Sequence, residues 1–199
     1  MDKEIANDAD CYIKKALKAK KHLTECIKNY DMDLYKHSQN VAVLSYEIGR
    51  KLGFSKNGLD DLVTAAFLHD IGKTCISSEF LKQIEPFTDD ELYIIRSHSL
   101  LGANFCEKKG IKTSIIVAIL LHHEREDGNG YPLGILGRNI PPMAKIIAVA
   151  DSYDAMISDR GYNQPFDKEI AHKEITNNAG ILYDTVIVEA FKQIKLVEV

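Results

Sequence analysis

Tryptophan is absent from the 199 residues, and cysteine and proline are scarce, with four and five copies. The cysteines lie far apart and form no CxxC pair, so neither a zinc knuckle nor a thioredoxin-like redox motif is indicated. No apolar run approaches the ~20 residues that a membrane-spanning helix needs, and the acidic start MDKE is unlike a secretory signal. We therefore expect a cytoplasmic protein.

Positive charge is not in excess either. The chain has 25 lysines and arginines against 29 aspartates and glutamates, which gives a formal net charge of -4. This balance argues against polymeric nucleic acid or an anionic membrane as a partner, while a local cationic pocket can still hold a small anion. The remaining composition, 45% hydrophobic and 27% charged, is typical of a globular protein with one buried core.

Apolar residues recur at helical spacing along most of the chain, and no segment shows the period of two typical of strands. We predict an all-α helical bundle with an N-terminal helix leading into it. Residues 115–117 alone would also suit a buried strand, but the neighbouring pattern favours a helix. The predicted helices cover residues 9–30, 33–52, 59–68, 88 through 98, 114–123, 143–156 and 184–195.

Histidines and aspartates stand at or near the ends of these predicted helices, and seven of them form a candidate ligand set. One histidine on an apolar helix is more often a core or surface residue than a ligand, but burying so many titratable groups without a metal carries a severe desolvation penalty. Mixed imidazole and carboxylate donors favour iron, manganese or a similar divalent ion. We expect a two-metal centre, bridged by the carboxylate of Asp70, with ligands His37, His69, Asp70, His98, His122, His123 and Asp151.

The order of these motifs resembles the HD-GYP domain, a bacterial subclass of the HD-superfamily phosphohydrolases, over residues 31–191. The motifs are His37-Ser38, His69-Asp70-Ile71-Gly72-Lys73, His98, His122-His123-Glu124-Arg125 with Gly130-Tyr131-Pro132, and Asp151. The resemblance implies hydrolysis of cyclic di-GMP to linear pGpG, and in some members GMP, in second-messenger signalling. It assigns the same seven metal ligands and divides the chain into an N-terminal helical segment, residues 1–30, and the HD-GYP domain, residues 31–199.

The resemblance also implies which residues contact the substrate. Lys73 and Arg160 match phosphate-binding residues, and Lys73 and Asp70 are the expected catalytic pair. In the loop that contains Gly130, Tyr131 and Pro132, Gly128 and Gly130 permit backbone geometry closed to other residues. Tyr131 offers a ring for stacking on guanine, and Pro132 stiffens the exit of the loop.

Two further aspartates have expected roles beside the ligands. Asp33 lies four residues before His37, where three-metal members carry a glutamate, and is a candidate third-metal ligand. An exposed or helix-capping aspartate is an equally good interpretation. Asp154 shares a helical face with Asp151 and is expected to orient either a ligand histidine or the helix rather than to bind metal.

The expected mechanism is attack by metal-activated hydroxide on phosphorus, with the ions and Lys73 stabilising charge on the phosphoryl oxygens. Family members commonly carry a basic residue where this chain has Asn163, which removes one cationic contact. Two alternatives stay open. One is a sensor or interaction module with little turnover, and the other is hydrolysis of a different substrate such as cyclic GMP-AMP. Further candidate partners are a protein that contacts the GYP loop and a second copy of the chain at the N-terminal helix.

Overall fold

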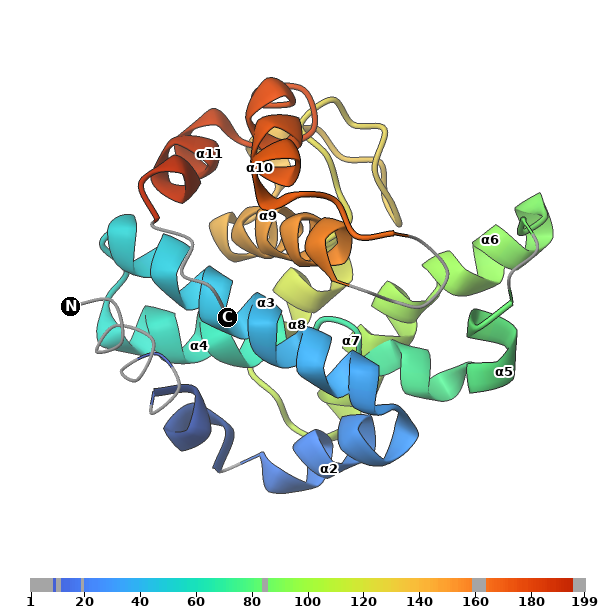
Figure 1. Cartoon of the computed structure of the whole chain (residues 1–199). Coiled ribbons are helices and arrows are strands. Elements are labelled where there is room, and N and C mark those ends of the chain that lie inside the picture. Colours follow the sequence, from blue (N-terminus) through green and yellow to red (C-terminus); the bar gives the residue numbers. More distant parts are fainter. Residues whose placement is uncertain (1–8, 10–11, 19, 84–85, 159–163, 195–199) are drawn as a thin grey trace.

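The computed structural model describes residues 9, 12–18, 20–83, 86–158 and 164–194. Within these ranges the chain is helical and contains no β-strand, which confirms the predicted all-α bundle (Figure 1). The elements are α2 (Lys21–Tyr30), α3 (Met32–Lys51), α4 (Lys56–Leu68), η1 (Ile71–Cys75), α5 (Ser78–Leu81), α6 (Asp89–Arg96), α7 (His98–Lys108), α8 (Thr113–Leu121), η2 (Gly137–Asn139), α9 (Pro142–Ile157), α10 (Lys168–Asn177) and α11 (Thr185–Lys192).

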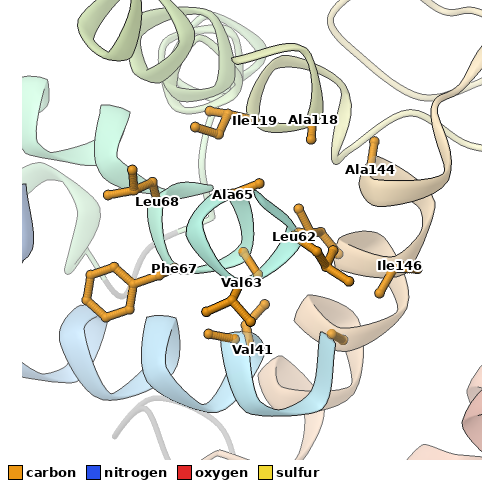
Figure 2. Packing of buried hydrophobic residues seen from close by; sticks show 14 of the residues in the cluster. Val41, Leu62, Val63, Ala65, Phe67, Leu68, Ala118, Ile119, Ala144 and Ile146 are labelled. Carbon is orange, nitrogen blue, oxygen red and sulfur yellow. The ribbon is translucent and has the colours of Figure 1, made fainter. Parts of the chain in front are cut away.

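Helix α4 is the centre of the hydrophobic core. Every residue from Leu62 to Leu68 is buried, so the helix is covered on all sides rather than along one stripe. Figure 2 shows why: Val63 points toward Val41 of α3, while other α4 side chains face Ile119 of α8 and residues of α9. The Phe67 ring packs edge-on against Tyr35 of α3, with the ring centroids 5.8 Å apart. The C-terminal end of α4 is consequently held inside the molecule, and the His69-Asp70 pair follows directly.

The N-terminal helix is interrupted rather than continuous. Residues 12–18 are helical, but Lys20 has φ -114° and ψ 23°, and a new helix, α2, begins at residue 21. Leu17 and Leu23, on either side of the interruption, are both buried in one core. The division of the chain at residue 30 stays a prediction.

The helix predicted from Thr88 through His98 is two helices. Thr88 caps α6 through a reciprocal contact with Glu91, as expected. Ser97 then separates α6, which has no buried residue, from α7, whose first residue, His98, is buried. Figure 1 shows α6 extending away from the bundle. The break thus places His98 at the start of a packed helix instead of within a solvated one.

Two short helices and one end differ from the sequence-based expectations. Neither α5 nor α10 was expected, because α10 buries only Ala171 and Ile175 and its apolar signal is weak. The final helix begins after Asp184, which caps it, but ends at Lys192. The alternative of a strand at residues 115–117 is excluded by α8. No helix among the described residues is long and apolar enough to cross a bilayer, and the cytoplasmic location stays a prediction.

Gly72 allows η1 to lie directly against α7. A Cβ at this position would collide with the carbonyl oxygen of His98 and would lie 2.5 Å from the backbone nitrogen of Gly102. Its φ is not in the left-handed region, so the requirement is for space rather than for an unusual conformation. Gly72 therefore couples the backbone after Asp70 to the backbone of His98.

We expect Gly72→Ala to lower the free energy of unfolding by about 1–3 kcal/mol, because both contacting groups are backbone atoms that cannot rotate away. Urea denaturation followed by circular dichroism would measure the loss. Gly58→Ala is the matched control, since its Cβ would meet mainly the flexible side chain of Phe54 and should change stability by no more than about 1 kcal/mol. Equal stability of the two variants would contradict this account.

Candidate metal centre

All seven predicted ligands come together at one place in the bundle. They are presented by α3, by the ends of α4 and α8, by the start of α7, and by α9. Their donor atoms form three overlapping groups, each with all atoms within 4.8 Å of one another. The groups are His37, His69 and Asp70; Asp70, His98, His122 and His123; and His69, His122 and Asp151.

Asp70 lies between two sets of histidines. Its Oδ1 atom is 3.2 Å from His98 Nε2, and its Oδ2 atom is 3.4 Å from His69 Nε2 and 3.6 Å from His37 Nε2. On the Oδ1 side, His98 Nε2 lies 3.2 Å from His123 Nε2. Metal–ligand bonds of about 2.0–2.2 Å put the donors of one ion roughly 3 Å apart. The donor set and its spacing therefore fit two divalent ions that share Asp70.

Three of the histidines are oriented by backbone carbonyls at the ends of the helices that precede them, α4, α6 and α8. The Nδ1 atoms of His69, His98 and His122 lie 2.6, 2.7 and 2.6 Å from backbone carbonyl oxygens three residues earlier. Carbonyls at a helix end lack a partner within the helix, and a carbonyl oxygen only accepts, so each Nδ1 must donate. In a neutral ring the Nε2 lone pair then faces the centre and is free to bind metal.

His37 is oriented by a side chain instead. Its Nδ1 lies 2.6 Å from Asp154 Oδ2, which confirms the predicted orienting role of Asp154. Asn40 Nδ2 donates to the other oxygen of Asp154 at 2.9 Å, and Ser158 Oγ donates to Oδ2 at 3.2 Å. Two hydrogen bonds thus hold the Asp154 carboxylate in addition to its contact with the candidate ligand His37.

The two aspartates of the centre are ionised. Burial raises the pKa of the Asp70 carboxyl, but the charges of Lys73 and His69 outweigh it and hold the pKa well below its usual range. Burial likewise opposes ionisation of Asp151, whereas its hydrogen bonds and charge interactions with His37 and His69 hold its pKa well below the usual range. Both carboxylates are therefore ready to bind cations at neutral pH.

The histidines divide into two electrostatic groups. Burial lowers the pKa of His98 and His122, and it lowers the pKa of His123 to about 3, so these rings are neutral at pH 7. At His69, burial also lowers the pKa, but the neighbouring Asp70 and Asp151 outweigh it and raise the pKa to about 10. Without metal, His69 therefore keeps a proton that a metal ion has to displace.

The predicted phosphate contacts are only partly within the described residues. Lys73 Nζ lies 2.6 Å from Asp70 Oδ2, so its ammonium group stands beside the shared carboxylate. Arg160 and Asn163 lie outside the described residues. Both substrate-binding assignments stay predictions.

Asp33 is not brought into the cluster. Its side chain is 80% exposed, and its carboxylate lies 3.4 Å from Lys36 Nζ. The N-cap of α3 is Asp31, whose carboxylate accepts hydrogen bonds from the backbone N–H groups of Asp33 and Leu34 at 2.8 and 2.9 Å. This arrangement agrees with the interpretation of Asp33 as an exposed aspartate, and the third-metal role stays a prediction.

Glu124, to which the sequence reasoning gave no role, holds the loop that follows Pro132. Its buried carboxylate accepts hydrogen bonds from the backbone N–H groups of Leu133, Gly134 and Ile135 at 2.6, 3.1 and 3.0 Å. No periodicity could have revealed this contact, because it depends on the path of a loop. The only available signal was an acidic residue directly after two candidate ligands.

The two glycines of the loop have different roles. Gly128 has φ +78°, so its predicted conformational freedom is confirmed. Gly130 is required for a different reason: a Cβ there would lie 2.5 Å from Glu124 Cα and 2.5 Å from His123 O. Gly130 is therefore closed to other residues, as predicted, and the cause is the close approach of two backbone segments rather than a left-handed conformation.

Tyr131 is stacked on a candidate ligand. Its ring centroid is 4.6 Å from that of His123 with an interplanar angle of 29°, and its peptide bond to Pro132 is cis. The guanidinium of Arg96 lies over the Tyr131 ring, 5.5 Å from the centroid. The predicted stacking of Tyr131 on guanine stays a prediction.

A helical bundle that gathers histidines and aspartates from helix ends around one buried carboxylate defines a class of metal-binding domain. The family model described as HD domain matches residues 21–187, which is most of the chain. The chain therefore belongs to the HD domain family, and the family resemblance predicted from the sequence is confirmed.

Relatives within this family differ in their named substrates. A cyclic di-GMP phosphodiesterase from Thermotoga maritima is 38% identical over 167 residues, which cover 83% of this chain and 45% of the relative. A 3'3'-cGAMP-specific phosphodiesterase 3 from Vibrio cholerae is 34% identical over 140 residues, which cover 69% of this chain and 30% of that protein. The chain thus spans less than half the length of these two relatives.

The fold is also found among solved structures. Bd1817, a HDG"Y"P protein from Bdellovibrio bacteriovorus, superimposes with a TM-score of 0.65 at 23% sequence identity. The match covers 78% of this chain and 50% of Bd1817. At this identity the similarity establishes a common fold, which agrees with the predicted HD-domain bundle.

We expect Asp154→Ala to raise the dissociation constant for Mn²⁺ about 10- to 100-fold, because His37 loses the group that orients it. Titration of chelator-treated protein with Mn²⁺, followed by electron paramagnetic resonance of the free ion, would measure the change. His22→Ala is the control, since His22 is exposed on α2 and should leave the affinity unchanged. Unchanged affinity in the Asp154 variant would show that His37 needs no such support.

Metal binding at neutral pH should release close to one proton from His69. Its pKa of about 10 in the metal-free protein means that the ring is protonated at pH 7.5, whereas a metal ion binds only the neutral ring. The released proton should diminish as the pH rises toward 10, and the apparent metal affinity should rise over the same range. Calorimetry in two buffers of different ionisation enthalpy counts the protons; identical heats in both buffers at pH 7.5 would contradict the assignment.

Proposed function

We propose that the chain is a metal-dependent phosphodiesterase that hydrolyses cyclic di-GMP to linear pGpG, and in a further step GMP, in bacterial second-messenger signalling. The observation that carries the proposal is the position of Asp70, whose two oxygens face different groups of ligand atoms while Lys73 stands beside it. Two ions that share a carboxylate, with an ammonium group next to them, suit the displacement of an oxygen at a phosphate diester.

The seven ligands would hold two divalent ions, and their mixture of imidazole and carboxylate favours iron or manganese. When bound, such ions supply a Lewis acid and lower the pKa of water. Asp70 serves as the shared ligand, and its low pKa makes it a weak base rather than a proton store. Lys73 contributes positive charge at the phosphoryl oxygens, which requires no bidentate geometry.

The preference for cyclic di-GMP is supported by the name of the Thermotoga maritima relative and by the HD-GYP motifs. A second candidate substrate is cyclic GMP-AMP, which the Vibrio cholerae relative is named for. Cyclic GMP-AMP stays a candidate because Asn163 stands where family members commonly carry a basic residue, so one cationic contact with the substrate is missing. A homodimer and a protein partner at the GYP loop are further proposals, as are the absence of polymeric nucleic acid and of a membrane among the partners.

Anaerobic purification with metal quantification, followed by chromatography of the products from cyclic di-GMP and from cyclic GMP-AMP, tests the proposal. We expect pGpG from cyclic di-GMP, and background turnover with little bound metal in the His69→Ala, Asp70→Ala double variant. His22→Ala should keep both metal and activity. Tight binding of cyclic di-GMP by metal-loaded protein without product would favour the sensor alternative, and turnover of cyclic GMP-AMP alone would favour the second substrate.

A further inference from the structure

Arg96 lies at the edge of the metal centre on a platform of two rings. It is the last residue of α6, two positions before the candidate ligand His98. Its guanidinium carbon is 5.5 Å from the centroid of Tyr131, and Tyr131 stacks on His123 with a centroid separation of 4.6 Å. The guanidinium therefore contacts a ring that itself stacks on a candidate metal ligand.

The donors of this guanidinium have no hydrogen-bond or ion-pair partner among the described residues. Arg50 and Arg125 each reach a carboxylate, at 3.0 Å from Glu47 and 2.9 Å from Asp127. For the Arg96 side chain, no hydrogen bond or ion pair is found among the residues that the structure describes. The cation–π contact places the group over the tyrosine ring, and its five N–H donors find no partner among the described residues.

We propose that Arg96 is a specificity-determining residue that binds the O6 and N7 atoms of a guanine base of the substrate. This inference rests on the proposed hydrolysis of a cyclic dinucleotide. In that reaction the scissile phosphate would be bound by the metal ions and Lys73. Arg96 lies beside this site, next to Tyr131, and would therefore face another part of the same substrate molecule. A planar guanidinium pairs with both guanine acceptors, whereas adenine presents one acceptor and one amino donor along the same edge.

The inference predicts that removing Arg96 reduces the preference for guanine without disabling the metal centre. The probe is the hydrolysis of bis(p-nitrophenyl) phosphate, a diester without bases, with cyclic di-GMP and cyclic di-AMP measured as competitive inhibitors. For Arg96→Ala we expect the inhibition constant of cyclic di-GMP to rise about 10-fold or more and that of cyclic di-AMP to change little. Arg96→Lys should not restore the preference, because an ammonium group lacks the bidentate fork.

Lys109→Ala is the matched control. Its ammonium group lies 5.7 Å from the Phe105 ring centroid, so this variant also removes an exposed cation from an aromatic ring, but at the opposite end of α7 from His98. Both inhibition constants should remain at their wild-type values. Uninhibited hydrolysis of the base-free diester and the bound metal content should be the same in all variants.

Three results would overturn the assignment to guanine. An equal loss of affinity for both dinucleotides would mean a contact that does not depend on the base, and no loss would mean no contact. A loss of metal, or of base-free hydrolysis, would mean that Arg96 acts by positioning Tyr131 and His123. Product formation from cyclic di-GMP by the wild-type protein is measured separately, so failure of the proposed function is distinguished from failure of the Arg96 assignment.

Discussion

The ionised carboxylate of Asp70, buried among imidazoles, is the interaction on which the rest of the structure depends. A buried charge is tolerated only when it is paired, and Asp70 is approached by His37, His69, His98 and Lys73. Those partners come from α3, α4, η1 and α7, so the helices that form the core are also the elements that surround this one group. Packing of α4 on all sides then fixes the depth at which the carboxylate lies.

Helix termini provide much of the order at the centre. Three ligand histidines donate to carbonyls that would otherwise lack a partner at a helix end, so one hydrogen bond both caps the helix and selects the tautomer of the ring. This explains why His69, His98 and His122 stand at helix boundaries, where sequence patterns place breaks. The Ser97 break between α6 and α7 belongs to the same arrangement.

The fold class and the seven candidate ligands could be predicted from the sequence, because helical periodicity is local and the ligand motifs are ordered along the chain. The contacts of loops and single side chains could not. Glu124 accepts hydrogen bonds from backbone N–H groups that are nine to eleven residues away, and no local periodicity indicates these contacts. The helix interruptions at Lys20 and Ser97 each precede a helix that buries a residue near its start, Leu23 or His98, and local propensity does not encode this tertiary burial. The contact of Arg96 with the Tyr131 ring likewise depends on tertiary packing, and helical periodicity cannot predict it.

The three hydrogen bonds that Glu124 accepts affect the entropy cost of binding a ligand at this site. When a flexible segment becomes ordered on binding, its loss of conformational entropy lowers the affinity for the ligand. Here the carboxylate holds the segment after Pro132 in the folded protein itself, next to Tyr131 and through it Arg96. The segment after Pro132 is thus ordered by contacts within the protein, and a ligand that bound beside it would not lose affinity by ordering it.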